Sequence, residues 1–187
     1  MKTLVLGLGN PILTDDGVGV WVAQAVRAAL PPGSPVEVDE VSVGGLRLME
    51  RVLGYRRVIL IDALHPPLSL PGTIHRLTLD DLNRLSPTRH SASAHDTTLA
   101  TALETARRMG LALPEEFVIY AVEVENISDF GDQPTPAVSQ AIARTTQAVL
   151  SELVTQGEKD DFTRTHPPVS IFGRSDRRGA DSAGEIC

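Results

Sequence analysis

Two aspartates and a histidine are spaced along this 187-residue chain in a way that suits a metal-binding or catalytic site. Asp16 follows a short apolar run broken by Gly9-Asn10-Pro11, Asp62 ends the apolar run 58–61, and His95 lies where a polar loop meets a predicted helix. Two carboxylates and one imidazole form an O,O,N ligand set suited to a borderline divalent ion such as nickel or zinc. Three protein ligands also leave coordination positions open for a substrate.

Each of these residues also has a simpler interpretation. Asp15 or Asp16 could cap the next helix, which is a common role for aspartate. Asp62 could accept hydrogen bonds from turn amides, and His95 could lie on the surface of its helix. His90, in the same polar loop, competes with His95 on spacing alone. The residue pattern by itself therefore leaves the metal site and the structural roles both open.

The elements that would position these residues can be read from the hydrophobic pattern. Short apolar or alternating runs predict five strands, at 3–9, 36–41, 57–62, 72–78 and 117–122. Amphipathic stretches and stop signals predict four helices, at 16–30, 44–53, 95–109 and 135–154.

This order predicts an α/β fold: a three-layer sandwich with a mostly parallel five-stranded sheet and helices on both faces. Only about nine residues separate the strands at 57–62 and 72–78, too few for a helical crossover, so we expect 72–78 to be antiparallel. Ligands of such sheets bind beyond the carboxyl ends of the parallel strands. Asp16 and Asp62 are therefore predicted at one edge.

The chain is long enough for one domain, which we assign to residues 1–156. From Gly157 the sequence turns polar, and we expect 157–187 to be a largely disordered C-terminal extension.

Composition argues against several partners. The net charge of −7 gives no electrostatic basis for nucleic-acid binding. The longest apolar runs have five or six residues, too few to cross a membrane, and no signal peptide is recognisable. Cys187 is the one cysteine, which excludes a disulfide framework and favours a cytoplasmic protein.

Four segments, in this order, resemble the nickel-iron hydrogenase maturation endopeptidases. Gly7-Leu-Gly-Asn-Pro-Ile-Leu-Thr-Asp-Asp-Gly-Val-Gly19 is the most specific of them. Val58-Ile-Leu-Ile-Asp62-Ala is similar to the second motif of that family and Ser93-Ala-His95-Asp-Thr-Thr-Leu99 to its third. Val122-Glu-Val-Glu-Asn-Ile127, followed by Pro134-Thr-Pro-Ala-Val138, resembles the closing strand and last helix. The resemblance covers about residues 3–154.

The resemblance implies a phosphorylase/hydrolase-like fold and a peptidase, aspartate-type or nickel-dependent. It would remove a short C-terminal extension from a hydrogenase large-subunit precursor after nickel insertion. Asp16, Asp62 and His95 would be the catalytic and nickel-contacting residues, and His90 would have no role. The nickel would be supplied by the substrate. One departure is Val43-Gly44-Gly45-Leu46, where many members carry Gly-Thr; we expect this loop to line the cleft.

Three other functions compete with this one. Peptidyl-tRNA hydrolases also begin with a strand and Gly-Leu-Gly-Asn-Pro, but their Asn-bearing His motif is missing here. A dinucleotide-binding module is a poor match, because Ile12 occupies the third glycine position. A nickel-checking chaperone without peptidase activity fits the same metal residues. No Gly-x-Ser-x-Gly or His-Glu-x-x-His motif points to a conventional hydrolase.

Overall fold

The computed structural model describes residues 2–42, 46–65, 69–85 and 103–165. The chain divides into two compact units, Met1–Glu152 and Leu153–Cys187. The first unit contains five strands: β1 (Thr3–Leu8), β2 (Val36–Val41), β3 (Arg57–Leu64), β4 (Ile74–Leu77) and β5 (Glu116–Glu123). The helices are the 3-10 turn η1 (Thr14–Gly17), α1 (Val18–Ala29), α2 (Leu46–Val52), α3 (Leu79–Leu85) and α5 (Pro136–Thr165), and residues 103–108 are also helical.

The strands form one sheet in the order β2-β1-β3-β5-β4. The pairs β1–β2, β1–β3 and β3–β5 are parallel, and β4 is antiparallel to β5. The predicted mostly parallel sheet with an antiparallel 72–78 strand is therefore confirmed. All eight residues of β3 are buried, as expected for a central parallel strand with both faces covered.

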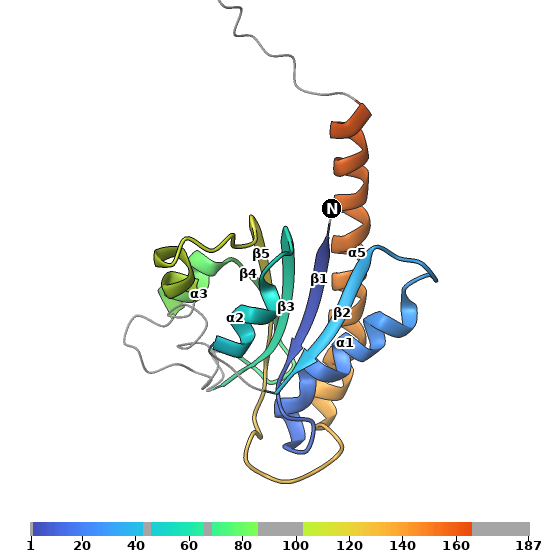
Figure 1. Cartoon of the computed structure of the whole chain (residues 1–187). Coiled ribbons are helices and arrows are strands. Elements are labelled where there is room, and N and C mark those ends of the chain that lie inside the picture. Colours follow the sequence, from blue (N-terminus) through green and yellow to red (C-terminus); the bar gives the residue numbers. More distant parts are fainter. Residues whose placement is uncertain (1, 43–45, 66–68, 86–102, 166–187) are drawn as a thin grey trace, which may run out of the picture. The chain divides into compact units, whose positions relative to one another are not determined.

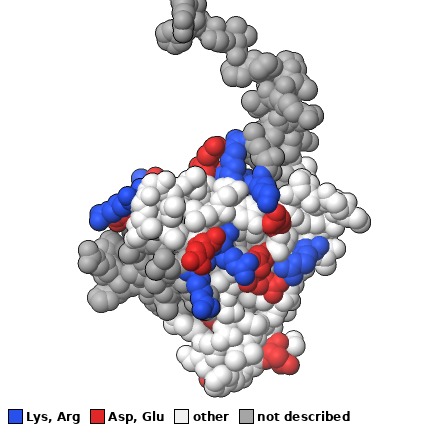
Figure 2. All heavy atoms as spheres, in the orientation of Figure 1, with Lys and Arg blue, Asp and Glu red and all other residues white. Residues whose placement is uncertain are grey.

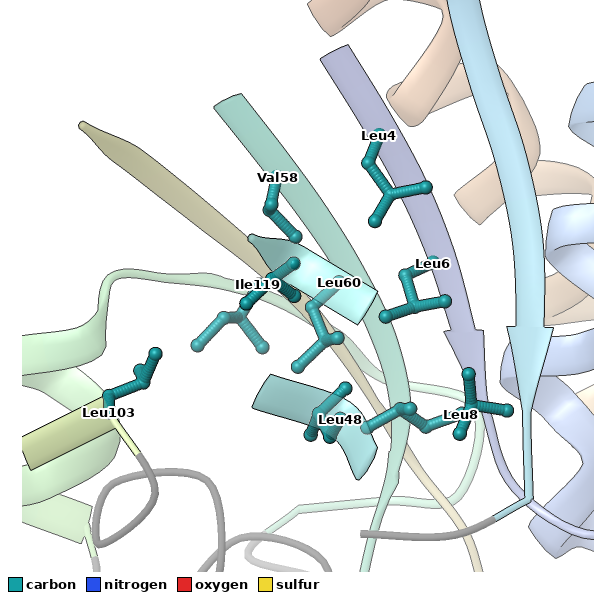
Figure 3. Close-up of a cluster of buried hydrophobic side chains, with 10 residues drawn as sticks. Leu4, Leu6, Leu8, Leu48, Val58, Leu60, Leu103 and Ile119 are labelled. Carbon is teal, nitrogen blue, oxygen red and sulfur yellow. The ribbon is translucent and has the colours of Figure 1, made fainter. Parts of the chain in front are cut away.

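One face of the sheet packs under α2 and the helical residues that begin at Leu103. Alternate residues of β1, β3 and β5 point to this face, and Figure 3 shows their side chains meeting those of the helices. The buried residues of this cluster are Leu4, Leu6, Leu8, Val41, Leu48, Val52, Val58, Leu60, Leu103 and Ile119.

The opposite face is covered by α1 and by the part of α5 up to Glu152 (Figure 1). Gly19 of α1 lies so close to the sheet that a Cβ there would be 2.3 Å from the carbonyl oxygens of both Leu8 and Ile61. Glycine at this position lets α1 pack directly on β1 and β3. The helices therefore cover both faces of the sheet, as the sequence predicts.

The bounds of the first and last helices differ from the prediction. The helix predicted to begin at residue 16 starts instead as η1, and α1 begins at Val18. The last helix, predicted to end at 154, continues to Thr165, so the first nine residues of the extension that we expected to be disordered are helical. The predicted domain boundary itself stays a prediction. None of the helices within the described ranges combines the length and apolarity needed to span a bilayer.

Helix α3 was not predicted, although the sequence carries a signal for it. Thr78 and Asp81 form a reciprocal capping box: the Thr78 N–H and hydroxyl donate to Asp81 Oδ2, at 3.0 and 2.7 Å, and Asp81 N–H donates to Thr78 Oγ1 at 3.2 Å. A Thr-x-x-Asp pattern before Leu82 marks a helix start.

Candidate functional site

Asp16 lies in η1, just after the carboxyl end of β1. The Asn10 N–H donates to Asp16 Oδ2 at 2.7 Å and thereby orients the half-buried carboxylate. Gly9 makes the tight turn possible: its φ is +127°, and a Cβ there would lie 1.8 Å from the Asp16 carbonyl oxygen. Asn10 thus positions Asp16 through a hydrogen bond from its backbone N–H, and Gly9 does so by allowing a close approach of the two backbone segments.

Asp15 has a structural role, although neither it nor Asp16 caps the helix. The residue before α1 is Gly17, and no side chain caps this helix. Asp15 is fully buried, and its carboxylate accepts hydrogen bonds from the Asn126 N–H (3.2 Å) and from the N–H and hydroxyl of Thr135 (2.7 and 3.1 Å). Because Thr135 directly precedes α5, Asp15 ties the first motif to the start of that helix. The helix-cap interpretation is therefore wrong for both residues.

Asp62 lies within the carboxyl-terminal half of β3 and is only 3% exposed. Its Oδ1 accepts a hydrogen bond of 2.9 Å from the Ala63 N–H. By the period of two along a strand, Asp62 lies on the same sheet face as Leu60, the face covered by α2. Gly7 pairs with Ile61, so β1 and β3 run side by side to the same edge, and η1 packs against β3. The structure therefore brings the segments that carry Asp16 and Asp62 together at the carboxyl edge, as predicted.

A Glu123–His75 pair, with the carboxylate buried, lies at the same edge, and sequence reasoning missed it. Glu123 is fully buried at the end of β5, and its Oε1 is 2.8 Å from His75 Nε2. Because β4 is antiparallel, His75 pairs with Ala121, which in turn pairs with Asp62, so all of these residues share one face. Along the chain, His75 has no acidic residue at a telling spacing, and no local pattern indicates a pair separated by 48 residues.

The third predicted ligand lies outside the described residues. This applies to His95, to its competitor His90 and to the glycine loop at 43–45. Within the described part of the chain, no three His, Cys, Asp or Glu residues form a group that could hold a metal ion. The three-residue metal set therefore stays a prediction.

A hollow of about 220 Å³ lies on the same face of the sheet, toward the amino ends of the parallel strands. It is lined by residues that include Thr78, Arg107 and Phe117, the last of which is near the start of β5. Because Asp62 is near the other end of the strands, this hollow is separate from the candidate site.

Near the amino end of the central strands, charged side chains form an ion-pair network between the sheet and α5. Arg57 Nη2 donates to Glu152 Oε1 at 2.6 Å, and Arg76 donates to both Glu152 oxygens at 2.8 and 3.0 Å. The hydrogen bond from Arg76 is the main cause that lowers the pKa of Glu152 to about 2. Burial, together with the negative charge of Glu152, raises the pKa of Tyr120. These shifts reflect the attachment of α5 to the sheet.

Comparison with known proteins gives consistent matches. A family model described as hydrogenase maturation protease matches residues 20–152. The hydrogenase 2 maturation protease of Escherichia coli K12 is 28% identical over 150 residues, which cover 76% of this chain and 90% of that protein. A hydrogenase expression/formation protein of Thiocapsa roseopersicina is 27% identical over 195 residues, with coverage of 99% and 87%. The solved structure of a hydrogenase maturating endopeptidase from E. coli superposes with a TM-score of 0.70 at 28% identity, covering 84% of this chain and 94% of that one.

Proposed function

Because this chain belongs to the hydrogenase maturation protease family, we propose that it removes the C-terminal extension of a nickel-iron hydrogenase large-subunit precursor after nickel insertion. The observation that carries the proposal is the pair of carboxylates near the carboxyl ends of β1 and β3, each oriented by a backbone N–H. This edge is where ligands bind in open α/β sheets.

The two carboxylates suit the recognition of a cation that arrives with the substrate. A backbone hydrogen bond, from Asn10 to Asp16 and from Ala63 to Asp62, orients each group. A carboxylate accepts up to about four hydrogen bonds or metal contacts, so a group oriented in this way can still contact an ion. With His95 as the third residue, the set offers too few ligands to extract the nickel and enough to register it.

The proposed reaction is hydrolysis of one peptide bond in the precursor. Water adds to the scissile carbonyl, the C–N bond breaks, and the departing amine takes up a proton. Precursor-bound nickel next to the scissile bond would polarise that carbonyl. Asp16, Asp62 and His95 would hold the nickel-bearing segment in position, so that precursor without nickel would not be aligned for cleavage.

The deciding experiment incubates the full chain with a large-subunit precursor, with and without nickel loaded, and follows the intact mass of the precursor. We expect the loss of one short C-terminal peptide from the nickel-loaded precursor only. Equal cleavage of both precursors would refute the nickel check. Tight binding of nickel-loaded precursor without any cleavage would instead identify a nickel-checking chaperone.

Three variants test the residues in the same assay. Asp16→Asn, Asp62→Asn and His95→Ala should each abolish cleavage while thermal unfolding stays cooperative. The asparagine variants keep side-chain size and remove the negative charge, so they separate electrostatic contact from packing. Wild-type processing by any one of them would remove that residue from the site.

A further inference from the structure

Two loops at the carboxyl edge are joined by hydrogen bonds into one unit, which we call the loop pair and define as residues 10–15 and 125–132. The Gly131 N–H donates to the Ile12 carbonyl at 3.1 Å, and Leu13 and Gly131 form a parallel β-bridge. The Thr14 hydroxyl donates to the Asp129 carbonyl at 2.7 Å. Asp15, buried beneath, binds the start of the second loop. Hydrogen bonds between the two loops therefore define the conformation of the loop pair.

The loop pair exposes two large apolar side chains, one on each loop. Phe130 is 82% exposed and Ile12 is 57% exposed. Each directly precedes one partner of the Leu13–Gly131 bridge, so their backbones run side by side. Leaving an aromatic ring in water forgoes the free energy of its burial, and a rigid backbone keeps it there. Exposed apolar groups that two hydrogen-bonded loops present together can form part of a binding surface.

The rim of this apolar pair is acidic. The loop pair and the residue after its first loop contain Asp15, Asp16, Glu125, Asp129 and Asp132, and no lysine or arginine. Glu125, Asp129 and Asp132 are exposed on the same loop as Phe130. In Figure 2, the end of the molecule that carries these loops in Figure 1 shows acidic and uncharged atoms, while the basic side chains gather elsewhere on that face.

We propose that the loop pair docks the hydrogenase large-subunit precursor, with Phe130 and Ile12 entering an apolar pocket that lysine or arginine side chains surround. This inference rests on the proposed function, because it takes the substrate as the partner. Asp16 directly follows the first loop and is hydrogen-bonded to Asn10 within it, so a protein bound there would bring its own chain to the candidate site. The negative rim selects a positively charged partner surface.

The charge pattern also argues against a second copy as the partner. In a symmetric dimer through this surface, Glu125, Asp129 and Asp132 would face the same three acidic residues. Like charges placed opposite one another oppose such an interface. The large-subunit precursor is therefore the occupant that we test.

The test compares Ile12→Ala/Phe130→Ala with Met109→Ala as a matched control. Met109 is also an exposed apolar side chain, at 64%, but it follows the helical residues 103–108 and precedes the start of β5, far from the carboxyl edge. Binding of nickel-loaded precursor is measured by calorimetry, and processing is followed separately as kcat and KM. Thermal unfolding checks that all variants are folded.

We expect the double variant to bind the precursor roughly 30-fold more weakly, the loss typical of an aromatic anchor, and Met109→Ala to bind like the wild type. KM should rise accordingly, and kcat at saturating precursor should stay unchanged. Glu125→Gln/Asp132→Asn should slow association and flatten its dependence on salt.

The outcomes separate the docking surface from the proposed function. If wild type and double variant bind and process the precursor equally, the docking proposal is overturned and the endopeptidase stands. If the wild type binds without cleaving and the double variant loses binding, the docking surface stands and the endopeptidase fails. A wild type that neither binds nor cleaves overturns both. A wild-type dimer in sedimentation that the double variant abolishes would make a second copy the occupant and overturn the docking proposal.

Discussion

The two ends of the central sheet treat their carboxylates differently. Near the amino end, Glu152 is neutralised by Arg57 and Arg76, side chains of opposite charge. At the carboxyl end, the hydrogen bonds to Asp15, Asp16 and Asp62 come mainly from backbone N–H groups. Glu152 is therefore held by ion pairs, whereas these three aspartates are held mainly by backbone dipoles.

These two arrangements suit different tasks. An ion pair cancels the charge of the carboxylate and joins two elements, as Glu152 joins α5 to β3 and β4. Backbone amides orient a carboxylate but leave its net charge in place. Accumulating such charge in a partly desolvated edge costs stability, unless a cation binds there. This arrangement fits our proposal that a cation from the substrate binds at the carboxyl end, whereas Glu152 joins elements of the fold.

The largest effect should come from neutralising one carboxylate at each end. Asp62→Asn should lower the rate of precursor processing about a thousandfold, equivalent to about 4 kcal/mol of activation free energy. Glu152→Gln should leave that rate within about twofold of wild type, because Glu152 lies near the amino end of the sheet, away from the candidate site. Processing rates at saturating nickel-loaded precursor make the comparison.

Thermal unfolding of the same two variants provides the control. Glu152→Gln should be less stable than the wild type, whereas Asp62→Asn should be about as stable. If both variants process the precursor equally well, or if Asp62→Asn loses its activity by unfolding, the division between the two ends is wrong.

Asp15→Ala should have the largest effect on stability at the carboxyl end. Removing this buried carboxylate leaves the Asn126 and Thr135 amides without their acceptor, and we expect a loss of about 3 kcal/mol in the free energy of unfolding. Hydrogen exchange should show faster exchange at these two amides. An unchanged free energy would mean that the loop pair is held without Asp15.

The sheet could be predicted from the sequence because its strands carry their own hydrophobic pattern. Val58–Ile61 is continuous and apolar, and β3 is buried throughout. The short connection from Asp62 to Gly72 was enough to predict the antiparallel strand. Helix α5 runs beyond Gly157 although glycine and the polar residues after it suggested an end. The glycine and the polar composition after it were therefore a weaker guide than the strand pattern.

The candidate site could be predicted only where topology determines the neighbours. The parallel strands β1 and β3 end at one edge, so the sequence predicts Asp16 and Asp62 at the same place. The partners of Asp15 lie 110 to 120 residues away, and Glu123 lies 48 residues from His75. Such contacts depend on loop paths and on the register of an antiparallel strand, which no local pattern encodes.

A smaller effect, and a dependence on pH, should come from the amino end. Glu152→Gln should lower the free energy of unfolding by about 2 kcal/mol at neutral pH, because Arg57 is nearly buried and loses a charged partner. The pKa of Glu152 in the folded protein is about 2, below its ordinary value of 4.5. The stabilisation is therefore complete above about pH 5 and declines as the pH falls from 4.5 towards 2.

Urea unfolding of wild type and Glu152→Gln at about pH 6 and about pH 3 tests this dependence. The difference between the two proteins should shrink by roughly half at the lower pH. A difference that grows in acid would contradict the assignment of Glu152 as the ionised partner of the two arginines.

The smallest effect should come from Thr78→Ala, which removes the capping box of α3 away from the carboxyl edge. Losing the hydroxyl that binds Asp81 should cost about 1 kcal/mol in the free energy of unfolding. The hydroxyl and backbone of Thr78 help to hold the pKa of Asp81 below its ordinary value. NMR titration of Asp81 should therefore show a higher pKa in the variant. Because Thr78 lies near the amino end of the sheet, precursor processing should be unchanged at a temperature where both proteins are folded. A loss of processing under these conditions would extend the functional surface beyond the carboxyl edge.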